Sequence, residues 1–254
     1  IDPLWISIDG PKEVHDANRK FMDNKPSYDQ IVRNIAIFQN NNIKLRASVV
    51  ITSVFPKPLE IINHLLKLGF SSFSMTPVRP GSKNSFTIEN ISELLLGYDL
   101  LYEEIKKQCL HNNFTMFSVL KEDMTLAAFN YFTSRIKQIK RCDFGNQLVI
   151  DAKGEIYPCL YFVDDAEFSY GNIKDGYKAK YQDEEMLVHN RGNCRTCWAR
   201  YLCGGTCFYG SKVATGDCLD IEPVECILKK HLAEKCLELL VFMREHNIDI
   251  YKLY

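Results

Sequence analysis

The sequence predicts an α/β protein made of an incomplete parallel α/β barrel, a small cysteine-rich domain with a β-hairpin, and a C-terminal helix. Two observations predict this fold class. Apolar strands and amphipathic helices alternate as β-α-β-α-β up to about residue 80, an order typical of parallel sheets. The alternation then stops, and cysteines recur at regular spacings between residues 142 and 226.

The elements of the first half follow from local signals. The first strand should cover residues 4–8 and end in the turn Asp9-Gly10-Pro11. A helix should begin after Ser27, because Gln30 stands three residues further on, the spacing of a capping box. The pattern then predicts a strand over residues 43–51, a helix over 59–68 that ends before Gly69, and a strand over 70–76.

The second half is predicted to be helical at both ends and cysteine-rich between them. Long helices should cover residues 87–111 and 224–246, with another helix within 121–137. Between them, residues 148–157 read as a hairpin whose turn contains Gly154, a residue suited to positive φ. The predicted domains are therefore residues 1–137 and residues 138–254.

Composition excludes several classes of function. The chain has 254 residues and a net charge of −1, so nothing indicates binding to nucleic acid or to an anionic membrane. No apolar run is long enough for a membrane span. Residues 1–5 lack the basic-then-apolar pattern of a secretion signal. We therefore expect a cytoplasmic protein whose ten cysteines serve metal ligation rather than disulfides.

The cysteine spacing indicates a metal centre. Cys194 and Cys197 form a C-x-x-C turn, which both zinc and iron–sulfur sites use. In Cys203-Gly-Gly-Thr-Cys207 the glycines would let the backbone pass close to a bulky inorganic group. The residues alone are compatible with either zinc or an iron–sulfur cluster. One alternative is therefore a non-enzymatic zinc-binding module that uses Cys194, Cys197, Cys203 and Cys207.

The whole pattern resembles a known module. It reads Cys142, Gly154-x4-Cys159, then C-x2-C-x5-C-x3-C over residues 194–207, and finally Cys226. This is similar to the SPASM domain, the auxiliary-cluster module of radical S-adenosylmethionine (SAM) enzymes that modify peptides and proteins. The resemblance implies two auxiliary [4Fe–4S] clusters. One would be held by Cys194, Cys197, Cys203 and Cys226, and the other by Cys142, Cys159 and Cys207.

One feature of the second set stays open at this stage. Three cysteines leave one iron of a [4Fe–4S] cluster without a protein ligand. Either Cys218 is an extra ligand that closes the site, or the iron is free to bind a substrate thiolate. Cys109 and Cys236 lie among apolar residues of predicted helices and are expected to be plain core residues.

The first half resembles a radical SAM barrel. Ser7-Ile8-Asp9-Gly10-Pro11, with His15 shortly after it, looks like the fourth strand of that barrel and the loop that follows. Leu45-Arg46-Ala47 looks like the fifth strand. The resemblance implies that Ser7, Asp9 and Arg46 help to bind SAM. It identifies no catalytic residue.

The sequence departs from the family at two places. The Cys-x3-Cys-x2-Cys motif of the SAM-cleaving cluster is absent, so we interpret the chain as a fragment that should not cleave SAM by itself. Sulfatase-maturing relatives carry an Asp after Tyr-Pro-Cys, where this chain has Leu160. Leucine cannot accept a proton.

The departure at Leu160, together with Cys197-Trp198-Ala199-Arg200-Tyr201-Leu202-Cys203, favours relatives that form cysteine thioethers in ribosomally made peptides. The expected partners are a cysteine-containing precursor peptide and an external electron donor. A sulfatase-maturing activity is the enzymatic alternative.

Overall fold

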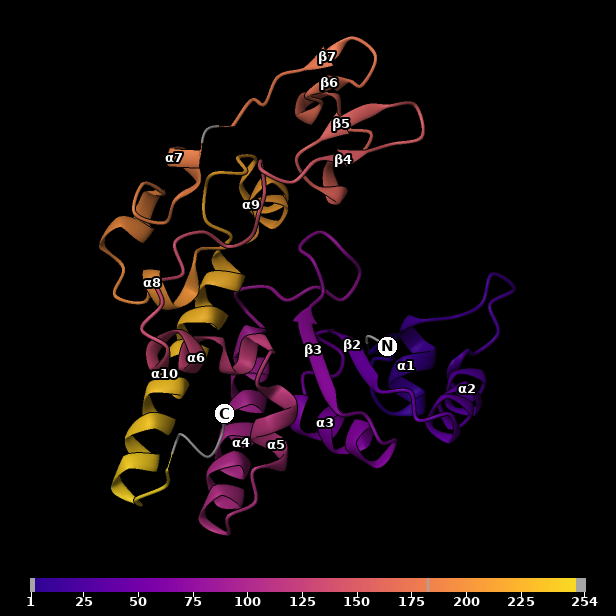
Figure 1. Cartoon of the computed structure of the whole chain (residues 1–254), viewed down its shortest axis with the longest axis vertical. Coiled ribbons are helices and arrows are strands. Elements are labelled where there is room, and N and C mark those ends of the chain that lie inside the picture. Colours follow the sequence, from indigo (N-terminus) through magenta and orange to yellow (C-terminus); the bar gives the residue numbers. More distant parts are fainter. Residues whose placement is uncertain (1–2, 182, 250–254) are drawn as a thin grey trace. The chain divides into compact units, whose positions relative to one another are not determined.

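The computed structural model describes residues 3–181 and 183–249, and these form two compact units (Figure 1). We call the first the sheet unit; it contains the described residues up to Thr133 and from His231 onward. The second, the cysteine unit, is Ser134–Lys230. The sequence-based boundary lay four residues later, and it assigned the whole closing helix to the second domain. The structure divides that helix between the units, and the predicted outer limits at residues 1 and 254 lie outside the described residues.

The sheet unit contains a parallel sheet with the strand order β1-β2-β3. The strands are β1 (Leu4–Ser7), β2 (Leu45–Ile51) and β3 (Ser72–Pro77). The helices α1 (Lys12–Asn18) and α2 (Tyr28–Asn40) connect the first two strands, and α3 (Pro58–Lys67) connects the last two. The predicted β-α-β-α-β order and its parallel pairing are therefore confirmed.

The two faces of this sheet differ in chemistry. Strand β2 alternates strictly between buried and half-buried residues, because successive side chains of a strand point to opposite faces. The buried face is apolar and contains Leu45, Ala47, Val49, Ile51, Phe73 and Met75. The opposite face is more open and mostly polar, with Trp5, Ser7, Arg46, Ser48, Ser74 and Thr76. We call it the polar face.

The start of α2 corrects one sequence-based prediction. Ser27 precedes the helix as expected, but its side chain makes no capping bond. Instead, Asp16 Oδ1 accepts hydrogen bonds from the backbone N–H groups of Ser27 (3.0 Å) and Tyr28 (2.9 Å). The capping box was wrong because the Ser27 hydroxyl donates to the Arg19 carbonyl oxygen at 2.9 Å and lies 3.0 Å from His15 Nε2, so it does not accept from the first turn of the helix.

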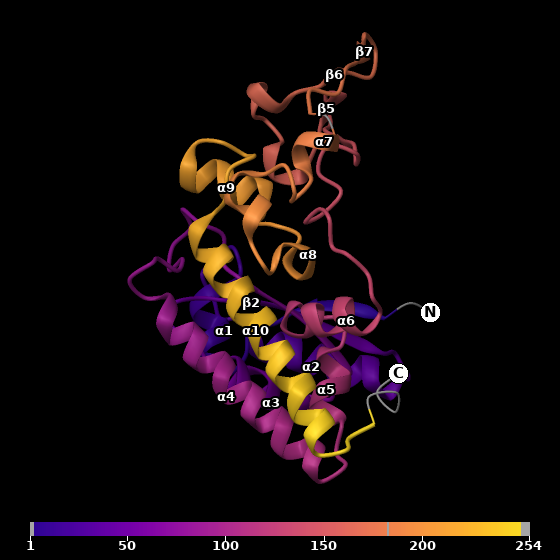
Figure 2. The ribbon, with the colours of Figure 1, turned by 90° about the vertical axis from the view of Figure 1, so that its left-hand side faces the viewer.

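The rest of the sheet unit is helical. It contains α4 (Ile91–Leu110), α5 (Thr115–Leu120), the short 3₁₀ helix η1 (Met124–Leu126), α6 (Ala127–Thr133) and the larger part of α10 (Pro223–Glu245). Figure 2 shows α10 lying along α4, where His231 Nε2 is 2.9 Å from Asp99 Oδ1. Cys109 and Cys236 are 2% and 0% exposed, which confirms them as core residues.

The cysteine unit begins with small antiparallel strands in the order β4-β5-β6-β7. The predicted hairpin is confirmed as β4 (Val149–Ile150) and β5 (Glu155–Tyr157), with Gly154 at φ +86° in its turn. Strands β6 (Gly171–Asn172) and β7 (Gly176–Tyr177) extend it. The short helices η2 (Leu160–Phe162) and η3 (Ala166–Phe168) lie between β5 and β6. After β7 come α7 (Asp183–Met186), η4 (Gly192–Thr196), α8 (Arg200–Cys203) and α9 (Phe208–Thr215).

A buried cluster holds these short elements together. It consists of Phe144, Phe162, Phe168, Met186, Phe208 and Cys218, and we call it the aromatic cluster. The rings of Phe162 and Phe168 stack with centroids 3.8 Å apart, and those of Phe144 and Phe208 with centroids 4.4 Å apart. Aromatic burial of this kind supplies the apolar core that such short strands and helices lack by themselves.

Candidate functional site

The first group of thiols comes from three neighbouring stretches of the cysteine unit. Cys194 lies in η4 and Cys197 directly after it, Cys203 is the last residue of α8, and Cys226 lies near the start of α10. None of the chain's ten cysteines forms a disulfide. These four sulfurs are therefore free thiols.

The four thiols lie within electrostatic reach of one another. Burial raises the pKa of Cys194 to about 11; Arg191 opposes this rise, while Cys203, Cys226 and Cys197 add to it. Burial likewise raises the pKa of Cys226, with further contributions from Cys203 and Cys197. Such effects between thiolates fall off with distance. Coulombic effects therefore link the four cysteines that the resemblance grouped, and their role as metal ligands stays a prediction.

Two cysteines of the second set share a cationic neighbour. Burial would lower the pKa of Arg141, but Glu225, Cys207 and Cys142 outweigh it and raise that pKa. Cys207 stands at the N-cap of α9, and Cys142 is exposed. Cys159, the third member, is half-buried and packs against the aromatic cluster.

Cys218, the uncertain extra ligand, is itself a member of the aromatic cluster and is 3% exposed. Burial raises the pKa of its thiol, and a hydrogen bond with Tyr181 opposes that rise. The side chain therefore has both apolar packing and a polar partner without any metal.

The two glycines between Cys203 and Cys207 are required by protein neighbours. Gly204 and Gly205 have φ of +72° and +85°, a region that L side chains rarely adopt. A Cβ on Gly204 would lie 2.4 Å from Gln138 Cγ, and a Cβ on Gly205 would lie 2.8 Å from Arg191 Nη1. The loop thus passes closely between a glutamine and a buried arginine.

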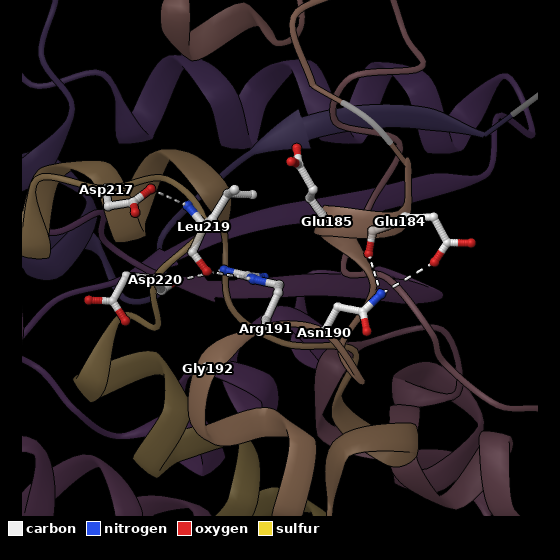
Figure 3. Close-up of a pocket in the computed structure, with 8 residues that line it drawn as sticks. All are labelled: Glu184, Glu185, Asn190, Arg191, Gly192, Asp217, Leu219 and Asp220. Atoms are coloured by element: carbon white, nitrogen blue, oxygen red, sulfur yellow. Dashed lines mark hydrogen bonds between the residues drawn. The ribbon is translucent and has the colours of Figure 1, made fainter.

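Arg191 is the cation that sequence reasoning missed. The residue is 2% exposed. Its guanidinium donates hydrogen bonds to the carbonyl oxygens of Leu219 (3.0 Å) and Asp220 (2.6 Å), as Figure 3 shows. It also donates to the carbonyl oxygens of Thr206 (3.2 Å) and Cys218 (3.5 Å). Its guanidinium also lies 4.5 Å from the centroid of the Phe208 ring. One side chain therefore joins the Cys203–Cys207 loop to the segment around Cys218. In the sequence, the available signal for this arginine was its position three residues before Cys194, next to the cysteine motif.

A second group of charges lies between the two cysteine sets. Burial would raise the pKa of Glu225, but Lys229, Arg141 and the N–H of Cys207 together hold it below its usual range. Glu225 is thus a carboxylate with two cationic neighbours. Neither it nor its partners carries any sequence motif, since their contacts join residues far apart in the chain.

The described side chains do not surround a single-ion site. Within residues 3–181 and 183–249, no group of three or more His, Cys, Asp or Glu side chains could hold a metal ion. Around a cuboid cluster each thiolate binds a different iron, so the sulfurs stand further apart than around one ion. The two cluster sites and the four-cysteine zinc site both stay predictions.

The residues expected near SAM separate into two environments. Ser7 and Arg46 share the polar face, because Trp5 is paired in register with Arg46 and Ser7 lies two residues beyond Trp5. The Arg46 guanidinium lies 4.2 Å from the Trp5 ring centroid, and its Nη1 is 2.5 Å from Glu122 Oε2. On this face Ser7 is exposed and Arg46 is half-buried.

Asp9 lies in a buried network beyond the end of β1. Its carboxylate accepts hydrogen bonds from Arg19 Nε (2.9 Å) and Nη2 (3.1 Å) and from the Val50 N–H (3.0 Å). The residue is 1% exposed. These contacts tie the turn after β1 to β2.

His15 belongs to the same network and is fully buried. Its Nδ1 accepts from the Asp9 N–H at 3.3 Å, so Nε2 carries the proton and faces Ser27 Oγ at 3.0 Å. Burial lowers the pKa of His15, which keeps the ring neutral. The imidazole therefore supports the turn that carries Asp9.

Comparison with known proteins supports the class. No family model matches the chain. The serine-type anaerobic sulfatase-maturating enzyme of Bacteroides thetaiotaomicron is 24% identical over 235 residues, which cover 80% of this chain and 54% of that protein. The cysteine-type enzyme of Clostridium perfringens strain 13 is 25% identical over 225 residues, covering 80% and 57%. This chain thus spans about half the length of these curated relatives.

Solved structures agree on the fold. The chain matches hexahistidine-tagged anSMEcpe with bound AdoMet at a TM-score of 0.70 and 19% identity, over 98% of this chain and 67% of that one. Native anSMEcpe with bound AdoMet and Kp18Cys peptide matches at 0.69 and 18%, over 96% and 68%. The chain is related to radical SAM enzymes, as the sequence predicted, and these relatives are anaerobic sulfatase-maturating enzymes. No helix in the described part of the chain is both long and apolar enough to cross a membrane.

Proposed function

We propose that this chain is part of a radical SAM enzyme that forms a cysteine thioether in a ribosomally made peptide. Leu160 is the observation that carries the reaction type. It follows Cys159 directly and is 68% exposed, so the position is accessible but offers no proton acceptor. A site without a base there suits a substrate thiol that loses its proton to metal binding.

The cysteine unit is proposed to hold two auxiliary [4Fe–4S] clusters. Cys194, Cys197, Cys203 and Cys226 would bind one, which their mutual electrostatic effects support. Cys142, Cys159 and Cys207 would bind the other; the shared influence of Cys142 and Cys207 on Arg141 supports this. When bound, the clusters supply electron transfer and a soft metal site for a thiolate.

The second site is proposed to have room for a substrate ligand. Its three cysteines leave one iron position open, and Cys218 is already packed in the aromatic cluster with Tyr181 as its partner. A cysteine of the precursor peptide would fill that position. Holding the thiol fixed and deprotonated also lowers the entropic cost of bond formation.

The sheet unit is proposed to bind SAM on its polar face. Arg46 offers a guanidinium, the group best suited to a ligand carboxylate, and its stacking on Trp5 holds it in place. Ser7 offers a hydroxyl on the same face. Asp9 would act indirectly, because Arg19 and Val50 occupy its carboxylate. An external electron donor completes the proposed set of partners.

Oxidation of a side chain in a sulfatase is the second candidate, and the named activity of the curated relatives favours it. The two candidates differ in their products. The test incubates the full-length enzyme anaerobically with SAM, a reductant and a cysteine-containing precursor peptide. Thioether formation removes two hydrogens from the peptide and leaves one thiol fewer for iodoacetamide. A peptide that gains no cross-link, while a sulfatase peptide is modified, would establish the second candidate instead.

A further inference from the structure

One carboxylate lies next to a first-set cysteine in the chain and contacts the second cysteine set. Glu225 Oε2 accepts a hydrogen bond from the backbone N–H of Cys207 at 2.8 Å, and Glu225 Oε1 accepts one from Arg141 Nε at 3.2 Å. In the chain, Glu225 directly precedes Cys226 and Arg141 directly precedes Cys142. The Glu225 side chain thus joins one cysteine of the first set to two of the second.

Lys229 extends the network by one helical turn. It lies four residues after Glu225 in α10, so both side chains stand on the same face of the helix. Its Nζ donates to the carbonyl oxygens of Cys203 and Gly205, each at 2.7 Å. The loop from Cys203 to Cys207 is therefore held at both ends, by the cation at Cys203 and by the carboxylate at Cys207.

Stability alone does not account for this arrangement. The side chains of Arg141 and Glu225 are 33% and 17% exposed, so the pair has lost much of its hydration. Such ion pairs contribute little net stability compared with apolar residues of similar size. They do fix geometry, because each charge has a specific partner. The contacts of this network fall on a predicted ligand, on its immediate neighbour in the chain, or, for Gly205, on the loop between two predicted ligands.

We propose that Glu225 is a positioning residue that couples the two auxiliary cluster sites, with Arg141 and Lys229 as its partners. The inference rests on the proposed function, since it assumes two clusters. The Glu225–Arg141–Lys229 network sets the spacing of the two sites, and its charges influence the reduction potentials of both clusters. Removing the negative charge makes reduction of both clusters easier. Removing the Arg141 charge makes it harder, because each reduction adds an electron nearby.

The test compares Glu225→Gln, Arg141→Gln and the control Glu184→Gln in the anaerobically reconstituted full-length protein. Glu184 is an exposed glutamate of the same unit whose contact is with Asn190. Iron and sulfide are counted first, and the potentials of the clusters are then measured by redox titration with EPR detection. We expect upward shifts of both auxiliary clusters in Glu225→Gln, downward shifts of both in Arg141→Gln, and no shift in the control.

The outcomes separate the inference from the function on which it rests. A wild-type protein without auxiliary iron and sulfide contradicts the proposed function. Full iron content with unshifted potentials, or a shift in one cluster alone, overturns the coupling role. If Glu225→Gln loses iron, Arg141→Gln decides, because it keeps the carboxylate on the Cys207 N–H. A downward shift of both cluster potentials in Arg141→Gln then supports the inference, and potentials equal to those of the wild type reject it.

Discussion

Replacing Arg191 by leucine should lower the free energy of unfolding of the cysteine unit more than replacing any other charged residue of that unit. The side chain is fully buried and bridges segments that are distant in sequence. Leucine fills part of the volume and keeps the contact with Phe208, but it donates no hydrogen bonds. The variant therefore removes the donors and leaves most of the packing.

The magnitude follows from the contacts. Four carbonyl oxygens, those of Thr206, Cys218, Leu219 and Asp220, lose their donor. A buried acceptor left without a partner costs about 1–3 kcal/mol. The loss is partly offset, because the buried guanidinium no longer has to be desolvated. Removing one partner from a buried charged network typically costs about 3–5 kcal/mol, and we expect a loss in that range.

Urea unfolding under anaerobic conditions measures this loss. The chain has two tryptophans, so a Trp5→Phe background leaves Trp198 as the reporter of the cysteine unit. The matched control is Arg195→Leu, which removes an exposed arginine of the same unit. Arg191→Lys should lose about half as much, since an ammonium keeps the charge but reaches fewer carbonyls. A loss below about 1 kcal/mol for Arg191→Leu would refute this reasoning.

Three further predictions concern single positions. Gly97→Ala in α4 should destabilise the sheet unit by about 1–3 kcal/mol in thermal unfolding, because the new Cβ would lie 2.4 Å from the Pro56 carbonyl oxygen. Alanine usually stabilises a helix relative to glycine, so a higher Tm would contradict this close packing. His15 has a lowered pKa through burial, so the unfolded chain takes up this proton first and stability falls as pH drops below about 6.5. His15→Asn should flatten that slope in urea titrations, and an unchanged slope would show that another group causes it. Cys218→Ala should keep all auxiliary iron and sulfide, whereas loss of one cluster would make Cys218 its fourth ligand.

Local signals predicted the elements well. The strand and helix pattern of the first half came from side-chain periodicity, and Gly154 marked the hairpin turn. Each of these depends on neighbours within a few residues. The start of α2 shows the limit. Ser27 has the right residue type for a cap, but its hydroxyl bonds the Arg19 carbonyl oxygen and His15 instead, and no local pattern reports those partners.

The proposed metal ligands came from the sequence, and the polar network around them did not. Cysteine spacing is a property of the chain itself, and the resemblance that it carries grouped Cys194 with Cys226; that grouping stays a prediction. Arg191 and Glu225 act through contacts with distant segments and belong to no motif. Asp9 shows the opposite case, in which a residue suggested by resemblance turns out to bind Arg19 and the backbone of Val50.

The most direct test of the central claim is the iron and sulfide content of the anaerobically reconstituted chain and of its Cys194→Ala variant. Two auxiliary clusters predict about eight iron atoms and about eight sulfides per chain, and about half of each in the variant. These counts require no SAM cleavage and no knowledge of the peptide. Protein that instead held zinc without sulfide, or an iron content that Cys194→Ala left unchanged, would contradict the account.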